Sequence, residues 1–357
     1  MNYRNIVFAL LVIGALGAYK FTSARHDSIH VNVNEHIHRS IQVHENVEVV
    51  DQNDFDFDFD FDFDFETDHD LRDEEVVLER KYSVDNGDLL LVDIEHSDLV
   101  VESSSTNEAH IRIVLEATNM EKAREFYESL NFSVDEVRGG VEITANRRRN
   151  NNWNWGSNGR RQITVFVSLP TSFNYDVKMS HGDAKFDDIQ GDAIIYMSHG
   201  DLATSAIDGE NIRIKLSHGD YIGSELTADE VNLNASHGDI NVRTVTADRI
   251  DANLSHGDID VASASGQMYM SNSHGDIEVG VMRVGDSRFS NSHGDVSIMA
   301  LSDFGADVDF SASNVRMSSG MDFDGTLKKD RAEGNVNGGG PSIVARTSHG
   351  SVYLRNQ

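Results

Sequence analysis

A four-residue motif, Ser-His-Gly-Asp, recurs at a nearly constant interval in the C-terminal half of the chain. Its copies begin at residues 180, 198, 217, 236, 255, 273 and 292, and a variant, Ser348-His349-Gly350-Ser351, follows later. A unit of 18 or 19 residues cannot bury its own apolar face, so successive units must stack on one another. The repeat therefore restricts this half of the chain to stacked coils.

Apolar and polar residues alternate on both sides of the motif, as in Leu233 and Ala235 before one copy and Ile240 and Val242 after it. Alternation at period two predicts short strands, and the tetrad is then a corner between them. A second corner is expected at mid-repeat. These features predict an all-β fold, a β-solenoid of about ten coils over residues 171–357. Two degenerate coils are expected between His293 and His349.

The tetrad suits a corner because glycine adopts a positive φ and Ser or Asp can accept backbone N–H bonds. Stacking at about 4.8 Å would align the tetrads into columns, in which neighbouring carboxylates repel by about 1 kcal/mol even in water. Two interpretations remain open: a ladder that binds divalent metal or senses mildly acidic pH, and a turn copied by duplication with solvated histidines. The candidate metal ligands are His181, His199, His218, His237, His256, His274 and His293, with Asp183, Asp201, Asp220, Asp239, Asp258, Asp276 and Asp295.

Residues 76–170 are expected to form a small β-rich lead-in that contains one helix near residues 120–130. Thr118 is the expected N-cap, and Glu121 three residues later could complete a capping box. Trp153, Trp155 and five arginines lie in an Asn-rich stretch between Arg147 and Arg161. This island is either a solvated hairpin tip or a site for glycan, single-stranded nucleic acid or the chain's own acidic segment.

Residues 1–24 have the pattern of an export signal, with a basic start and an apolar run of about 13 residues, shorter than a membrane-spanning helix. Cleavage after Ala24 or retention as an N-terminal anchor are both compatible with this pattern. Residues 25–75 follow, with Asp-Phe alternation from Asp54 to Phe65 and strong negative charge. We expect a disordered, self-repelling spacer, the alternative being a strand that docks on a partner.

The composition excludes several classes of function. A net charge of −30 argues against nucleic-acid binding, and the absence of cysteine excludes disulfides, thiolate metal sites and cysteine nucleophiles. Membrane contact is expected only through the N-terminal segment if it is uncleaved. Contiguous Ser, His and Asp cannot reach one another in triad geometry, and no irregular cluster of acids or bases stands out, so no enzyme activity is expected.

The segment from Ile163 to Pro170, the run Tyr175–Phe186 and the repeated Gly-Asp-Ile-x-Val coils resemble the bacterial putative-adhesin family of β-strand-repeat domains, over about residues 80–357. The resemblance implies a β-solenoid outside the cytoplasm, in the periplasm, cell envelope or extracellular space, with a role in surface interaction. The predicted function is therefore an exported, non-enzymatic interaction protein whose partner is a surface polymer or envelope protein. The alternative is a module that binds, or is stabilised by, divalent metal; no other cofactor is expected.

Overall fold

The computed structural model describes residues 73–145 and 160–356, all of which belong to one compact unit. This part of the chain is almost entirely β-structure with one helix, α2 (Met120–Leu130), which confirms the all-β prediction. The predicted export signal and nearly all of the acidic spacer lie outside the described residues, and both stay predictions. No helix of the described residues is long and apolar enough to cross a membrane.

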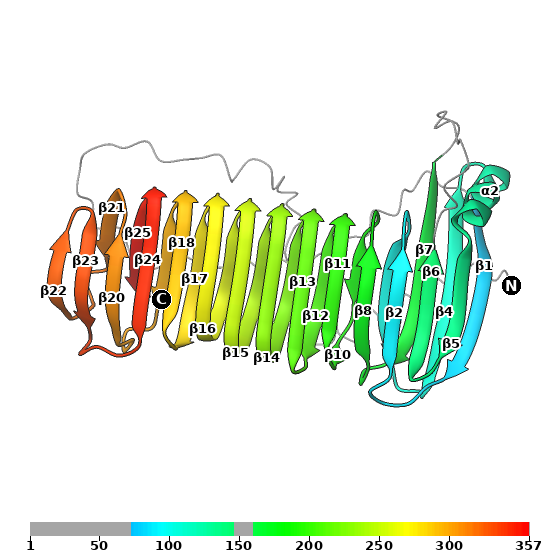
Figure 1. Cartoon of the computed structure of the whole chain (residues 1–357), viewed down its shortest axis with the longest axis horizontal. Coiled ribbons are helices and arrows are strands. Elements are labelled where there is room, and N and C mark those ends of the chain that lie inside the picture. Colours follow the sequence, from blue (N-terminus) through cyan, green and yellow to red (C-terminus); the bar gives the residue numbers. More distant parts are fainter. Residues whose placement is uncertain (1–72, 146–159, 357) are drawn as a thin grey trace, which may run out of the picture. The chain divides into compact units, whose positions relative to one another are not determined.

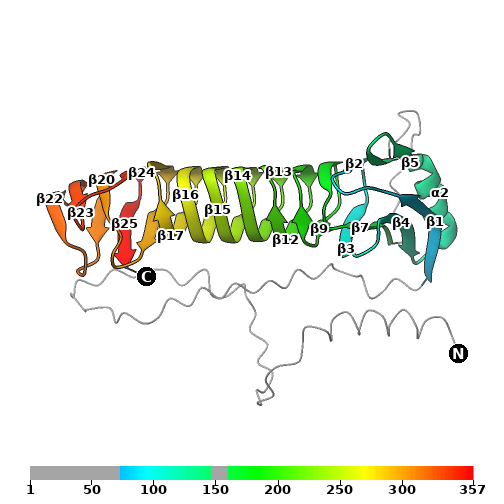
Figure 2. The ribbon, with the colours of Figure 1, turned by 90° about the horizontal axis from the view of Figure 1, so that it is seen from below.

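The sheet is built from coils, each with one strand before a corner and one after it, stacked side by side (Figures 1 and 2). The strands that precede a corner are β2 (Leu89–Ile94), β8 (Asn174–Met179), β11 (Ala193–His199), β13 (Asn211–His218), β18 (Ser287–His293), β20 (Ala306–Ser311) and β24 (Ser342–His349), and β6 (Gly140–Ala145) pairs with the first of them. Those that follow a corner are β3 (Asp98–Ser104), β9 (Ala184–Phe186), β12 (Leu202–Asp208), β17 (Ile277–Val284), β19 (Val296–Ala300), β21 (Asn314–Met317) and β25 (Ser351–Asn356), and β7 (Arg161–Pro170) pairs with the first of these. The short β10 (Ile189–Gln190) pairs with the end of β12.

Three long strands form the middle of the stack, β14 (Tyr221–His237), β15 (Ile240–His256) and β16 (Ile259–His274). Each runs from one tetrad to the next and passes through the mid-repeat position without a break in the strand. Their parallel register aligns each tetrad with the tetrads of the two neighbouring coils, so that His237 is the partner of both His218 and His256. Alternate residues such as Val242 and Val261 are fully buried, and these form the continuous core between the two columns of strands.

The N-terminal segments continue the same stack. Strand β2 pairs in parallel with β8 on one side and β6 on the other, and β3 likewise lies between β9 and β7. Beyond them the pairing becomes antiparallel, through β1 (Asp73–Ser83), β4 (Glu108–Ala117) and β5 (Phe132–Val137). Helix α2 buries Phe126 and Leu130. Its N-cap is Asn119, whose side chain accepts from the Lys122 N–H; the predicted cap, Thr118, was wrong by one residue.

The C-terminal coil is out of sequence order. Strands β24 and β25 lie between β18/β19 on one side and β20/β21 on the other, although β20 and β21 come earlier in the chain. The prediction of two degenerate coils between His293 and His349 was therefore wrong, because these two histidines belong to neighbouring coils. The intervening residues lie beyond the last tetrad and end in an antiparallel hairpin, β22 (Phe323–Lys328) and β23 (Arg331–Val336).

Candidate functional site: the columns at the repeat corner

The glycine column is fixed by backbone geometry. The glycines of the seven tetrads have φ between 106° and 128°, a region that side chains rarely adopt. A Cβ atom at any of these positions would lie 2.0–2.3 Å from a carbonyl oxygen of the preceding coil. The glycine N–H in turn donates to the histidine carbonyl of the next coil, as Gly219 does to His237. Glycine is therefore required by the close approach of the coils.

The aspartate column has a structural role in every coil. Each of the seven predicted aspartates accepts the backbone N–H of the residue at the same position in the next coil, with N···O distances of 2.7–2.8 Å. Asp98 does the same for the N–H of Asp183 and so begins the column in the lead-in. Burial raises the pKa of the Asp201 and Asp258 carboxyls, while these N–H bonds lower it. The N–H donors partly offset the repulsion expected within a bare column.

The histidines form one continuous stack of parallel rings. Ring centroids of neighbouring coils are 4.6–4.9 Å apart and the planes between tetrad histidines differ by at most 5°. All seven predicted histidines and His349 are exposed. His96 extends the stack at 4.6 Å from His181. His96 was not among the predicted residues because its motif, Glu95-His96-Ser97-Asp98, lacks the glycine; the alternating residues that flank it were the available signal.

The ring geometry bears on the metal-ladder prediction. A zinc ion bound by two imidazoles at about 2.0–2.1 Å holds their nitrogens at most about 4.2 Å apart. The parallel rings are spaced more widely than that and do not converge. Among the described residues, no three His, Cys, Asp or Glu side chains form a group that could hold a metal ion. Chelation by the stack would therefore require the rings to turn out of their parallel arrangement, and metal binding stays a prediction.

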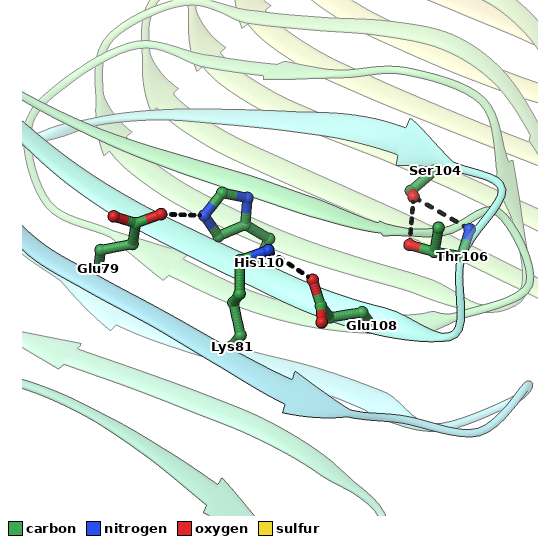
Figure 3. Close-up of polar contacts among 6 residues, drawn as sticks. All are labelled: Glu79, Lys81, Ser104, Thr106, Glu108 and His110. Carbon is green, nitrogen blue, oxygen red and sulfur yellow. Dashed lines mark hydrogen bonds and ion pairs between the residues drawn. The ribbon is translucent and has the colours of Figure 1, made fainter.

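A second polar cluster lies on β1, β4 and the loop before β4 (Figure 3). His110 Nε2 lies 2.8 Å from a carboxylate oxygen of Glu79, and the Lys81 ammonium donates to Glu108 at 2.8 Å. The hydroxyl of Ser104 lies against Thr106 at 2.9 Å and is not directed toward the histidine. The His–Glu pair is thus not joined to a hydroxyl nucleophile here. The cluster consists of a hydrogen bond between His110 and Glu79 and an ion pair between Lys81 and Glu108, which link β1 to β4.

Most of the Trp- and Arg-containing island lies outside the described residues, so neither interpretation of it is tested. Arg161, at its end, begins β7, and its guanidinium lies 4.0 Å from the centroid of the Phe126 ring on α2. This stacking links the helix to the sheet by a cation–π contact.

Comparison with known proteins identifies one family model and several solved structures that match at low identity. A family model described as Toastrack DUF4097 matches residues 88–355. No curated protein matches the sequence. A crystal structure of a putative adhesin from Parabacteroides distasonis is 11% identical, with a TM-score of 0.44, and the match covers 78% of this chain and 96% of that one. A putative adhesin from Bacteroides fragilis has 12% identity, a TM-score of 0.39 and coverage of 78% and 96%. A putative lipid binding protein from Parabacteroides distasonis has 12% identity, a TM-score of 0.39 and coverage of 79% and 96%.

Proposed function

The chain belongs to the Toastrack DUF4097 family, and from this premise we propose that it is an exported, non-enzymatic β-solenoid that binds a surface polymer or envelope protein. The stacked parallel coils and the sequence repeat support the solenoid. The apolar segment that precedes Arg25 supports export. The absence of cysteine is compatible with folding outside the cytoplasm without a disulfide-forming step.

The observation that carries the proposal is the exposed imidazole stack. Eight exposed histidines, from His181 to His349, present the same ring edge at one fixed interval along the coils. A polymer or repetitive surface that binds one ring weakly would meet the next at a short, fixed separation. Linked weak contacts of this kind raise the apparent affinity far above that of one contact. Because the coils already hold the rings in place, little conformational entropy is lost on binding.

The test compares two variants of the full chain for retention on isolated bacterial envelopes. The first carries His199→Asn, His218→Asn, His237→Asn and His256→Asn. The control carries Glu210→Gln, Asp229→Asn and Asp248→Asn, which change exposed side chains at mid-repeat, away from the tetrads. Far-UV circular dichroism verifies that both variants are folded. The proposal expects the histidine variant to lose most of the retention, about tenfold or more, and the control to keep it. Equal retention of the two variants would overturn it.

Metal binding by the same column is the alternative. At His199 the Nδ1 atom lies 3.4 Å from the carbonyl oxygen of Ser180, which leaves Nε2 as the nitrogen available to a metal. A thermal melt of the chelated protein, with Zn²⁺, Cu²⁺, Ni²⁺ or Ca²⁺ added singly, separates the two roles. An ion-selective rise of the midpoint that disappears in the four-histidine variant would favour metal. Loss of envelope retention without any metal response would favour the interaction role.

A further inference from the structure

Four side chains on two neighbouring strands form a patch on the outer face of the sheet that precedes the corner. Strand β11 carries Ile194 and Tyr196, and β13 carries Arg213 and Lys215; we call these four residues the tyrosine patch. Ile194 is in register with Arg213, and Tyr196 with Lys215. Ile214, between the two basic residues, is only 1% exposed and points into the core, so the four residues point outward. Strands β11 and β13 are neighbours in the stack (Figure 1), which brings the four side chains together.

The two basic side chains of the tyrosine patch lack a counter-charge. Both are exposed, and within the described residues neither Arg213 nor Lys215 makes an ion pair or a side-chain hydrogen bond. Their cross-strand neighbours on β14, Asn232 and Asn234, are uncharged, and so is Tyr196 on the other side. In a chain with 60 acidic and 30 basic residues, two adjacent cations without a paired carboxylate create a local positive region. Such a region attracts an anionic group that this part of the chain does not itself supply.

The ring of Tyr196 is open to a ligand, and another coil shows the contrasting case. Tyr269 on β16 also points out of this face, but the Arg249 guanidinium lies 4.2 Å from its ring centroid and binds Asp251 at 2.6 Å. The chain's own cation therefore occupies that ring. Tyr196 is partly exposed, and its ring makes no such contact with any other described residue. The ring of Tyr196 is thus available to pack against a group from outside the chain.

We propose that the tyrosine patch binds an acidic polysaccharide, an inference that rests on the proposed function and names the chemistry of its surface polymer. The Tyr196 ring packs against the apolar face of a sugar ring. Arg213 and Lys215 donate charge-assisted hydrogen bonds to carboxylates of the polymer. His199 and His218 each follow three residues after Tyr196 or Lys215 on the same strand, about 10 Å away. A polymer that crosses the corner therefore reaches the imidazole stack as well.

Two other anionic partners fit the patch less well. Nucleic acid carries one charge per about 1.7 Å of duplex, and a chain with a net charge of −30 repels so dense a row of phosphates. The carboxylates of a polysaccharide are separated by whole sugar rings, so two cations and the neighbouring amides suffice to bind one segment. An anionic membrane surface binds segments that insert apolar side chains into it, whereas Ile194, the aliphatic member of the patch, is partly buried on a strand.

The test is binding of fluorescently labelled polygalacturonate to the full chain in calcium-free buffer at neutral pH and about 0.05 M salt, with alginate as a second carboxylated polymer. The charge variant, Arg213→Gln with Lys215→Gln, should weaken binding about tenfold or more. Tyr196→Ser should weaken it about fivefold. Far-UV circular dichroism and thermal melts verify folding. If Tyr196→Ser lowers the thermal midpoint, the charge variant decides alone, because its exposed side chains are not part of the core.

The chain offers a matched control for each variant. Lys328→Gln with Lys329→Gln removes the same two positive charges at the exposed end of β22, in the hairpin beyond the last tetrad. Tyr269→Ser removes a tyrosine from the same face, but one whose ring the Arg249 guanidinium already covers. Both controls should bind the two polymers within about twofold of the wild type, since neither touches the patch.

Equal binding by the charge variant and its lysine control would overturn the proposal. So would failure of both polymers to bind, equal binding of neutral dextran, or stronger binding to phosphatidylglycerol vesicles, which would assign the patch to a membrane. The outcome is separable from that of the proposed function. If the four-histidine variant loses envelope retention and neither polymer binds, only the polymer chemistry is wrong. If that variant keeps envelope retention while the charge variant loses polymer binding, only the role of the imidazole stack is wrong.

Discussion

Replacing one tetrad glycine by alanine tests whether the corner is dictated by the approach of neighbouring coils. In Gly219→Ala the new Cβ would lie 2.0 Å from the carbonyl oxygen of Gly200 and 3.0 Å from a carboxylate oxygen of Asp201. Carbon–oxygen contacts between strands are normally about 3.3–3.6 Å, so the two coils must separate by about 1 Å. The φ of 123° adds strain of about 1–3 kcal/mol for a residue with a side chain.

The separation also weakens hydrogen bonds across the same gap. The Gly200 N–H donates to the His218 carbonyl at 3.2 Å, and the Asp220 N–H donates to the Asp201 carboxylate at 2.8 Å. Each is worth about 1–2 kcal/mol. With the strain, the expected loss in the free energy of unfolding is about 3–7 kcal/mol if both bonds are lost.

Gly338→Ala is the matched control, because Gly338 also has a positive φ, 88°, but no atom lies within 4 Å of its Cβ position. The free energy of unfolding of this variant should fall only by the cost of a positive φ at a residue with a side chain, about 1–2 kcal/mol. Urea unfolding followed by far-UV circular dichroism measures both variants, with equal m-values as the condition for comparing them. If the two substitutions cost the same, close approach of the coils is not what requires glycine in the tetrad.

Three further substitutions or deletions test other parts of the structure. Deleting residues 342–357 removes β24 and β25 from between two coils, so β20–β23 should detach from the stack. Limited proteolysis should then cut within residues 306–341. Unchanged protection of these residues would refute the observed order, in which β24 and β25 lie between the two coils. Asp239→Ala removes the acceptor of the Asp258 N–H and should cost about 1–2 kcal/mol in urea unfolding, whereas Asp248→Ala, an exposed site, should change stability by less than about 0.5 kcal/mol. Asp260→Asn should stabilise the protein by about 2–4 kcal/mol at about pH 8 and hardly at about pH 4. Because the pKa of Asp260 is raised from 3.8 to about 7, its carboxyl destabilises the fold increasingly as pH rises between these two values and fully above about 7, so an equal effect at both pH values would contradict the assignment.

The interior of the stack was predictable because it is periodic. Seven tetrads with alternating flanks determine where strands lie, which face is buried and that each histidine meets the next. The aspartate column was predictable only in part. The repeat shows that its charges must be neutralised, and Asp at a turn is known to accept backbone N–H bonds, but the repeat alone does not show that these bonds run from one coil to the next. The missing step was that the donor of the next coil, the N–H of Asp258 for Asp239, lies at the same position.

The ends were not predictable from the repeat. His96 joins the stack through a corner without glycine, where Ser97 takes the place that glycine has elsewhere. The order of the last coils depends on which strand pairs with the free edge of β18. Several segments with similar alternation could pair there. Local patterns cannot decide such a competition, because the outcome is set by packing between distant parts of the chain.

Non-repeating segments cover both ends of the stack, where the repeat alone would leave strand edges unpaired. A stack of parallel strands leaves a row of unpaired N–H and C=O groups at each end, onto which further strands could add. At both ends the parallel pairing gives way to antiparallel strands, β1, β4 and β5 on one side and the β22–β23 hairpin on the other. The outer strand β22 is short and carries Asp324 and Lys328, and charge on an edge strand disfavours further pairing. The length of the imidazole stack is therefore set by where these irregular segments stand in the chain. Nothing in the tetrad itself limits the number of coils, and the stack ends where the flanking sequence no longer repeats.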